Sequence, residues 1–265
     1  MLNSEVRRFK LWQDQIETEV EIKGSGPPLV WLHGPWGLNP DRAFVERLAR
    51  GNTVFAPRFP GTTRGDPNGV HALMGWLDLA VYHGELFDKL QLPAPALAGH
   101  SFGALLAAEI AAATPKGVRK LVLIDPVGLW RDDHPVKNWM VLSDKVRRSA
   151  LFADPDGEAA RRFFEVPSDP EARVDTLAQF NWALACTGKF VWPIADRGFK
   201  NRIHRVSAPT LILWGKADGI VAPVYAQEFA KGISGARVEL IDNAAHLPHL
   251  EQSETVLEAV RRFLT

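Results

Sequence analysis

Three side chains that together could activate an alcohol for attack on a carbonyl carbon are widely spaced along the chain. Ser101 lies at the centre of a Gly-His-Ser-Phe-Gly sequence, Asp218 ends a Trp-Gly-Lys-Ala-Asp sequence, and His246 follows Asn-Ala-Ala. A serine hydroxyl is a weak nucleophile, so an imidazole must take its proton and an aspartate must fix the imidazole tautomer. The order Ser, Asp, His is a known order for such a triad. The sequence therefore predicts acyl-transfer chemistry on Ser101.

The residues around Ser101 predict a sharp turn between a strand and a helix. Ala96-Leu-Ala98 suits a buried parallel strand, and the Ala/Leu-rich run 104–113 suits a packed helix. Gly99 and Gly103 flank the serine at two positions on either side, where a Cβ atom would collide with a neighbouring strand or helix. This turn places the hydroxyl clear of the sheet, at the positive end of a helix dipole.

Other residues compete for the acid and base roles. Asp125 also ends a predicted strand, before Pro126, and is either an alternative acid or a strand-ending cap. Asp242 lies close before the histidine and is typical of a turn. His249 is the alternative base, and its position three residues after His246 suggests solvent exposure or a structural hydrogen bond.

Short apolar runs alternate with helical patterns along most of the chain. Two early strands are predicted between Val6 and Ile22, with a turn around Gln13–Gln15. Later strands are predicted at 29–32, 53–56, 96–98, 118–124, 209–214 and 237–241, and helices at 40–50, 71–90, 104–113, 223–231 and 251–263. This alternation predicts an α/β protein with a mostly parallel sheet and helices on both faces.

The alternation stops between residues 127 and 204. This segment has helical patterns, Pro and Gly breaks and many aromatic residues, and none of its runs resembles a strand inside a sheet. We expect a core domain made of residues 1–126 and 205–265, and a helical cap made of residues 127–204. Ligands of open α/β sheets bind at the carboxyl ends of the strands, where such a cap would lie. Its aromatic residues could line an apolar pocket or form the core of the cap.

The composition excludes several classes of function. The 265 residues include 31 Lys+Arg and 31 Asp+Glu, so no clustered basic surface for nucleic acid is expected. Cys186 is the single cysteine, which excludes an intrachain disulfide; without metal-ligand spacing around it, we expect a small core residue and neither a metal nor a cofactor.

Targeting and membrane signals are also missing from the sequence. Met1–Lys10 lacks an apolar core typical of a secretory signal, and no apolar run reaches the roughly 18 residues of a membrane span. We therefore expect a cytoplasmic protein without a membrane partner. The sequence leaves the oligomeric state open.

The chain resembles the α/β-hydrolase superfamily from the His33-Gly34 loop, through the turn at Ser101, to the sequence Ala-His-Leu-Pro-His-Leu-Glu that ends at Glu251. The resemblance is to the cap-bearing group that includes carboxylesterases, meta-cleavage C–C hydrolases and lactone hydrolases. It implies the α/β-hydrolase fold, with Ser101 as nucleophile, His246 as base and Asp218 as acid.

The resemblance also implies an oxyanion hole with two backbone donors. One is the N–H of Phe102, and the other is the N–H of the residue after His-Gly, which here is Pro35 and has no N–H. We predict that the Trp36 N–H replaces it; Gly37, a side chain, or a hole with one donor fewer are the alternatives. Two nearby histidines, His33 in this loop and His100 beside the serine, are expected to have structural roles.

The leading hypothesis is a serine hydrolase that cleaves small, apolar carboxylic esters through an acyl-enzyme. A second hypothesis keeps the fold but changes the reaction to C–C cleavage, lactone opening, or cofactor-free lyase or oxygenase chemistry, because fold does not determine function. A third is a ligand-binding protein with weak hydrolase activity, which only the Pro35 anomaly supports.

Overall fold

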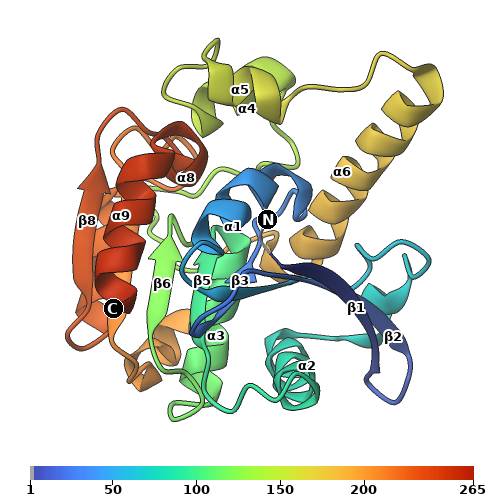
Figure 1. Ribbon diagram of the computed structural model, residues 1–265. Helices are drawn as coiled ribbons and strands as arrows, with labels where there is room; N and C mark the ends of the chain where they lie inside the picture. Colours follow the sequence, from blue (N-terminus) through green and yellow to red (C-terminus); the bar gives the residue numbers. More distant parts are fainter. Residues whose placement is uncertain (1–2) are drawn as a thin grey trace.

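A single sheet of eight strands organises the protein (Figure 1). The computed structural model describes residues 3–265; residues 1 and 2, which the predicted core domain includes, lie outside the described residues. The strand order is β1-β2-β4-β3-β5-β6-β7-β8. The strands are β1 (Ser4–Leu11), β2 (Ile16–Lys23), β3 (Pro28–Leu32), β4 (Thr53–Pro57), β5 (Ala96–His100), β6 (Leu121–Ile124), β7 (Thr210–Gly215) and β8 (Arg237–Ile241).

The sheet is antiparallel at one edge and parallel elsewhere. β1 pairs with β2, and β2 with β4, in antiparallel fashion, whereas all pairings from β4 through β8 are parallel. Every residue of β5, β6 and β7 is buried. Central parallel strands are apolar throughout because helices cover both of their faces. The predicted α/β architecture with a mostly parallel sheet is confirmed.

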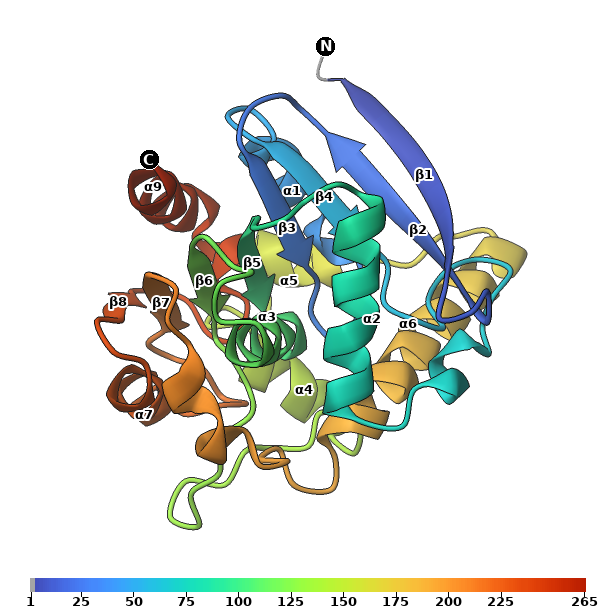
Figure 2. The ribbon, with the colours of Figure 1, turned by 90° about the horizontal axis from the view of Figure 1, so that it is seen from below.

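Helices form one layer on each face of the sheet. The larger core packs α2 (Trp76–Lys89), α3 (Phe102–Ala113) and α7 (Val224–Gly232) on one face, and the smaller core packs α1 (Arg42–Leu48) and α9 (Ser253–Leu264) on the other (Figure 2). The predicted bounds of two of these helices, α2 and α9, were wrong. The helix predicted from residue 71 begins at Trp76, because extended Gly75 precedes it. The helix predicted over 251–263 is divided at Gln252 into α8 (Pro248–Glu251) and α9.

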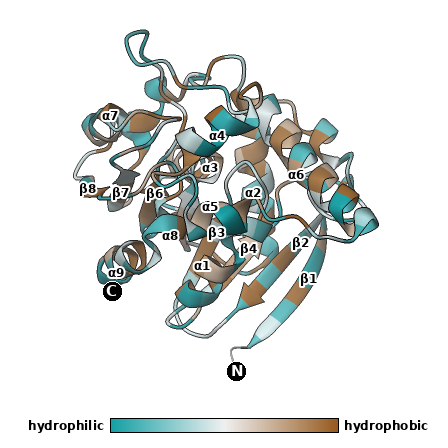
Figure 3. Ribbon diagram, turned by 90° about the horizontal axis from the view of Figure 1, so that it is seen from above, coloured by the Kyte–Doolittle hydropathy of each residue, from teal (hydrophilic) through white to brown (hydrophobic). Residues whose placement is uncertain are grey.

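The segment between β6 and β7 contains three α-helices and, within its described residues 127–204, no strand. These are α4 (Asp144–Leu151), α5 (Glu158–Phe163) and α6 (Pro170–Val191). In Figure 1 the arrowhead of β6 points towards α4 and α5, and Figure 3 shows α4, α5 and α6 from that end of the sheet. We call residues 127–204 the cap segment; its independence as a domain stays a prediction. Among residues 3–265, none of the helices has the length and hydropathy needed to cross a membrane.

Candidate active site

Ser101 occupies a strained turn between β5 and α3. Its backbone has φ of 53° and ψ of −110°, a region that side-chain-bearing residues rarely adopt. The N–H of Ser101 donates to the carbonyl oxygen of Ile124 at 2.8 Å, which holds the turn against the end of β6. The serine is fully buried.

The two glycines that flank Ser101 are needed for close backbone packing. A Cβ atom on Gly99 would lie 2.5 Å from the carbonyl oxygen of Gly103 in α3. A Cβ atom on Gly103 would lie 2.0 Å from the carbonyl oxygen of Leu32 in β3. Real Cβ atoms do not approach backbone atoms this closely, so both positions require glycine.

The structure brings Ser101, Asp218 and His246 together in one hydrogen-bonded chain. His246 Nε2 lies 2.8 Å from the Oγ of Ser101, and His246 Nδ1 lies 2.8 Å from Oδ2 of Asp218. The carboxylate of Asp218 can only accept, so Nδ1–H donates to it and Nε2 is left to accept from the serine hydroxyl. This is the tautomer that can remove the hydroxyl proton.

Asp218 is held in place by its own loop after β7. Its Oδ1 accepts from the N–H groups of Ile220 at 2.8 Å and Val221 at 2.9 Å. With the imidazole on Oδ2, the carboxylate has three N–H donors, which stabilise its negative charge in a buried site. The arrangement can therefore both orient the imidazole and stabilise an imidazolium.

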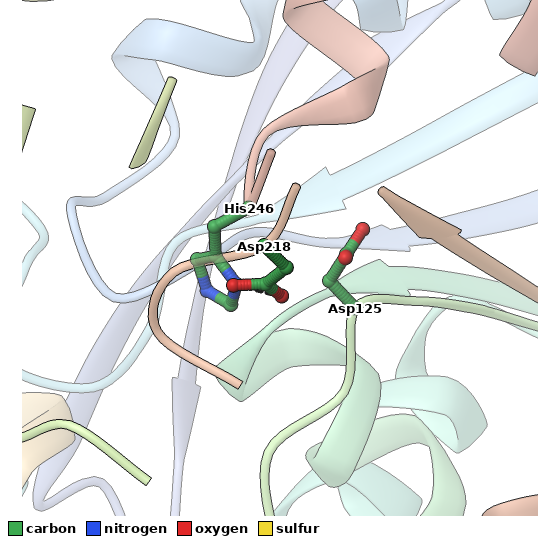
Figure 4. Close-up of side chains that lie close together, drawn as sticks. All are labelled: Asp125, Asp218 and His246. Atoms are coloured by element: carbon green, nitrogen blue, oxygen red, sulfur yellow. Dashed lines mark hydrogen bonds and ion pairs between the residues drawn. The ribbon is translucent and has the colours of Figure 1, made fainter. Parts of the chain in front are cut away.

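Asp125, the rival acid, lies next to this chain without bonding to the imidazole. Its Oδ1 accepts from the N–H of Gly215 at 2.9 Å. Polar atoms of Asp125, Asp218 and His246 all lie within 4.8 Å of one another (Figure 4). Burial, and then the charge of Asp218, raise the pKa of Asp125 well above its ordinary value.

The same three side chains could be considered as metal ligands, and their chemistry argues against it. A metal-binding carboxylate must be deprotonated, and the raised pKa of Asp125 favours its protonated form. The Nδ1 of His246 and the Oδ2 of Asp218 also bond each other. These two atoms are thus already engaged with each other.

The other two rival residues lie away from the reacting groups. Asp242 is exposed and pairs with Lys216 at 2.6 Å, as a turn residue would. His249 is fully buried, so the expectation of solvent exposure is wrong and that of a structural hydrogen bond is right. Its Nε2 lies 3.0 Å from Oδ1 of Asp41, whose partner on the other oxygen is Trp31 Nε1 at 2.9 Å.

His33 orders the loop after β3. Its Nδ1–H donates to the Gly34 carbonyl oxygen at 2.8 Å, and its Nε2 accepts from the N–H of Phe59 at 3.1 Å. Burial lowers the pKa of His33, which keeps the ring neutral, as this pair of bonds requires. His100 likewise has a structural contact, because its Nε2 donates to the carbonyl oxygen of His246 at 2.6 Å.

This loop leaves one backbone donor free at the predicted position. The Gly37 N–H donates to the Gly34 carbonyl oxygen at 3.3 Å and closes a turn around Pro35 and Trp36. Within residues 3–265, the Trp36 N–H donates to no acceptor. Phe102 is the first residue of α3, where backbone N–H groups lack intrahelical partners. The assignment of Trp36 and Phe102 as the oxyanion hole stays a prediction.

A cavity of about 1010 Å³ lies between the core and the cap segment. Its apolar lining includes Trp36, Phe44, Phe163, Phe180, Ala183 and Leu250, and it does not include Ser101. The Trp36 ring lies edge-on to His246, with ring centroids 6.1 Å apart, and also contacts Phe163 of α5 at 5.4 Å. Trp36 therefore connects the wall of this cavity with the imidazole that bonds Ser101.

Four arginines of the cavity lining already have acidic partners. Arg42 bonds Glu21, Arg58 bonds Glu19 as well as Glu21, Arg47 bonds Glu254, and Arg162 pairs with Glu158. Their charges are thus largely balanced within the protein.

Two residues that position the site were not predicted from the sequence. Gly215 ends β7, and a Cβ atom there would lie 1.9 Å from the carbonyl oxygen of Ala245, next to His246. A glycine at the end of a predicted strand could have indicated that another backbone segment packs against it. Glu251 accepts from the N–H groups of Ala245 at 2.7 Å and Ala153 at 2.8 Å, so it joins the histidine loop to the cap segment. Nothing in the sequence points to these backbone partners.

The model of the alpha/beta hydrolase family matches residues 29–259, which include the turn, all three members of the hydrogen-bonded chain and the cap segment. The chain belongs to the alpha/beta hydrolase family. Its membership accounts for the strand order, the strained serine and the segment inserted between β6 and β7. The family contains several chemistries, so it does not fix the reaction.

Similar proteins in this family include esterases and C–C hydrolases. The chain is 28% identical over 245 residues to a pimeloyl-[acyl-carrier protein] methyl ester esterase of Aromatoleum aromaticum, covering 86% of this chain and 94% of that protein. It is 26% identical over 269 residues to a 2-hydroxy-6-oxononadienedioate/2-hydroxy-6-oxononatrienedioate hydrolase of Pseudomonas putida, covering 94% and 87%.

A solved structure in the same family supports the fold. A mutant of the meta-cleavage product hydrolase of Pseudomonas fluorescens IP01 superposes with a TM-score of 0.75 and 17% identity, covering 97% of each chain. At this identity the likeness concerns the fold, which the α/β-hydrolase prediction described correctly.

Proposed function

We propose that this protein is a serine hydrolase, of the carboxylesterase type, that cleaves carboxylic esters through an acyl-enzyme intermediate. The observation that carries the proposal is the continuous chain of hydrogen bonds from Asp218 through His246 to Ser101, with both links at 2.8 Å. Esterases among the similar proteins are consistent with it.

The reaction follows from the atoms of this chain. The Oγ of Ser101 attacks the ester carbonyl while its proton passes to His246 Nε2, and the carbonyl electrons move to the oxygen. The N–H groups of Phe102 and Trp36 then stabilise the oxyanion. On collapse, the alcohol leaves with the proton from His246, and a water activated by the same imidazole hydrolyses the acyl-enzyme.

The cavity under the cap segment favours an apolar substrate. Its lining combines aromatic side chains with arginines that already have acidic partners, so it presents no strongly unbalanced charge to a substrate. Ser101 is fully buried and does not line this cavity, whereas Trp36 lines it and packs against His246. We therefore expect substrate entry to displace the Trp36 ring.

Hydrolysis of short p-nitrophenyl esters by Ser101→Ala tests the proposal. We expect turnover to fall to the level that remains without a nucleophile, a loss of about 10⁶-fold when such a serine is removed from a triad. Ser149→Ala is the matched control, because its hydroxyl only donates to the Lys145 carbonyl oxygen on the exposed side of α4. Retention of most activity in Ser101→Ala would remove the mechanism.

A second candidate, C–C bond hydrolysis, is favoured by the similarity to the Pseudomonas putida hydrolase. The same three side chains can serve this reaction, so a panel of esters, lactones and vinylogous diketones separates the two. A preference of kcat/KM for the diketones would replace the ester proposal. Tight ligand binding with negligible turnover throughout the panel would instead favour a binding protein.

A further inference from the structure

Two aspartates reach the same buried spot from neighbouring strands. Asp125 follows β6, and Asp218 lies in the loop after β7. These strands pair in parallel, so both acids lie at the carboxyl ends of neighbouring strands (Figure 4). Asp125 is fully buried, and the side chain of Asp218 is fully buried as well. Two carboxyl groups this close in a dry site do not both ionise readily.

The hydrogen-bond donors are divided unequally between the two acids. Asp218 accepts three N–H bonds, from Ile220, Val221 and His246. Asp125 accepts one, from Gly215, on Oδ1, and its Oδ2 is buried without a donor among residues 3–265. A negative charge is thus well stabilised on Asp218 and poorly stabilised on Asp125.

A proton on the second oxygen of Asp125 would resolve this imbalance. A carboxylic acid has an O–H donor, and the Asp218 carboxylate, which has an oxygen within 4.8 Å of an Asp125 oxygen, is the acceptor that faces it. Oδ1 would still accept from Gly215, so every polar atom of the Asp125 side chain would have a partner.

We propose that Asp125 is a positioning residue that holds a proton on Oδ2 and donates a hydrogen bond to Asp218. A single negative charge then faces His246, and the O–H of Asp125 helps to fix the Asp218 carboxylate. This inference rests on the hydrolase reaction proposed above, in which Asp218 orients the imidazole.

The ionisable groups that face Asp125 come from three other loops or helices. They are Asp218 after β7, His246 after β8, and Glu251 of α8. Burial is the largest cause that raises the pKa of Asp125, and both acids act in the same direction. Burial and the two acids therefore favour the neutral form of Asp125, against the single hydrogen bond from Gly215, which favours the charged form.

Asp125→Asn tests the protonation state, because an amide has the shape of the neutral acid. Its Oδ1 can accept from Gly215 and its Nδ2 can donate to Asp218, so we expect kcat/KM on an ester within about threefold of the unmodified protein. The midpoint of the acidic limb of the pH–rate profile, which reports protonation of the base, should not move. If Asp125 were ionised, removal of a charge beside His246 would move that midpoint down by about one pH unit, which would overturn the proposal.

Asp125→Leu tests the positioning role. It removes the donor, so we expect kcat to fall about tenfold or more while KM changes little, because Asp125 does not line the cavity. Asp242→Asn is the control for long-range charge effects, since its carboxylate is exposed and paired with Lys216. Equal activity of folded Asp125→Leu and Asp125→Asn would contradict a positioning role.

An infrared measurement decides the proton independently of activity. The spectrum of the whole protein at neutral pH should contain the carbonyl band of a protonated carboxylic acid that disappears in Asp125→Asn. Absence of a difference band overturns the proposal even if esters are hydrolysed and even if Asp125→Leu fails to fold. Conversely, if Ser101→Ala kept full activity, the hydrolase function would fail while the band remained.

Discussion

The carboxyl ends of the strands, which carry the site, and helix α6 of the cap segment are held by different kinds of contact. At the turn between β5 and α3, backbone lies against backbone, so that a Cβ on Gly103 would meet the Leu32 carbonyl oxygen at 2.0 Å. Helix α6 of the cap segment is instead attached by side chains, because Trp182 Nε1 donates to the Gly61 carbonyl oxygen and Lys189 Nζ to that of Leu73. Backbone packing fixes atomic positions to a fraction of an ångström. A side-chain contact can be lost by substitution of one residue without a shift of the backbone.

This difference predicts that conservative substitutions at the carboxyl ends of the strands lower activity strongly. Similar substitutions in the cap segment should change activity little. Substitutions of the same type in the two regions test it directly.

The largest effect is expected for Asp218→Asn. The amide keeps its oxygen on the N–H groups of Ile220 and Val221, so its Nδ2 faces His246 Nδ1 and donates to it. The imidazole then carries its proton on Nε2 and cannot accept the serine proton, and kcat should fall about 10⁴-fold. The matched change in the cap segment is Asp175→Asn, which removes an exposed pair with Arg64 at 2.6 Å and should alter kcat less than twofold, as is usual for surface pairs. Ester kinetics on both variants check this, and equal losses would refute the distinction between the regions.

A smaller loss is expected for Gly103→Ala. The added methyl group must push α3 away from β3, and a displacement of about 1 Å at a reacting group costs about 10²-fold in rate. In Gly188→Ala of α6 the methyl group comes too close only to the Met140 side chain, which is flexible and partly exposed and can move; Trp192 Cδ1 lies at an ordinary contact distance of 3.4 Å. Thermal unfolding and kcat should be nearly unchanged there, and a loss in Gly188→Ala as large as in Gly103→Ala would argue against the comparison.

The pH dependence of the free energy of unfolding gives a third comparison between the site and the cap segment. Burial and Asp218 raise the pKa of Asp125 in the folded protein, so between the ordinary aspartate pKa of about 3.9 and this raised value the folded state binds an extra proton. The stability that Asp125 contributes is complete below that range and is lost as the pH rises through it, at up to about 1.4 kcal/mol per pH unit. Urea unfolding of Asp125→Asn should lack this slope.

Glu158→Gln in the cap segment is the control for the pH series, because its exposed pair with Arg162 should leave the slope unchanged. Parallel stability curves for the unmodified protein and Asp125→Asn would show that Asp125 is not protonated in the folded state.

The smallest effect is expected for Pro35→Ala, which adds a backbone N–H to the loop after β3. If the Trp36 N–H already completes the oxyanion hole, the extra donor is superfluous and kcat should stay within about threefold. A gain of about 10²-fold would show that the hole of the unmodified protein lacks a donor. The measurement is ester turnover at saturating substrate.

The sequence allowed the turn at Ser101 to be predicted because its requirements are local. The glycines at 99 and 103, the preceding apolar run and the following Ala-rich run each limit the backbone within a few residues. The parallel sheet followed from alternation for a similar reason. The start of α2 was misplaced because extended Gly75 interrupts a continuous helical pattern.

Contacts between distant residues could not be predicted in this way. His249 is buried because Asp41, 208 residues earlier in the chain, bonds it, and no periodicity records that pairing. The nearness of Asp125 to Asp218 depends on the pairing of β6 with β7. Glu251 accepts from backbone N–H groups, and because almost every residue has one, the types of its partner residues do not indicate the contact.

Covalent labelling with an alkyl fluorophosphonate, followed by peptide mass spectrometry, tests the central claim most directly. We predict one adduct per chain, on Ser101, formed far more slowly in Asp218→Asn and at the normal rate in Asp175→Asn. An unlabelled Ser101, or labelling of Ser149 at a comparable rate, would contradict the claim that His246 and Asp218 activate this hydroxyl.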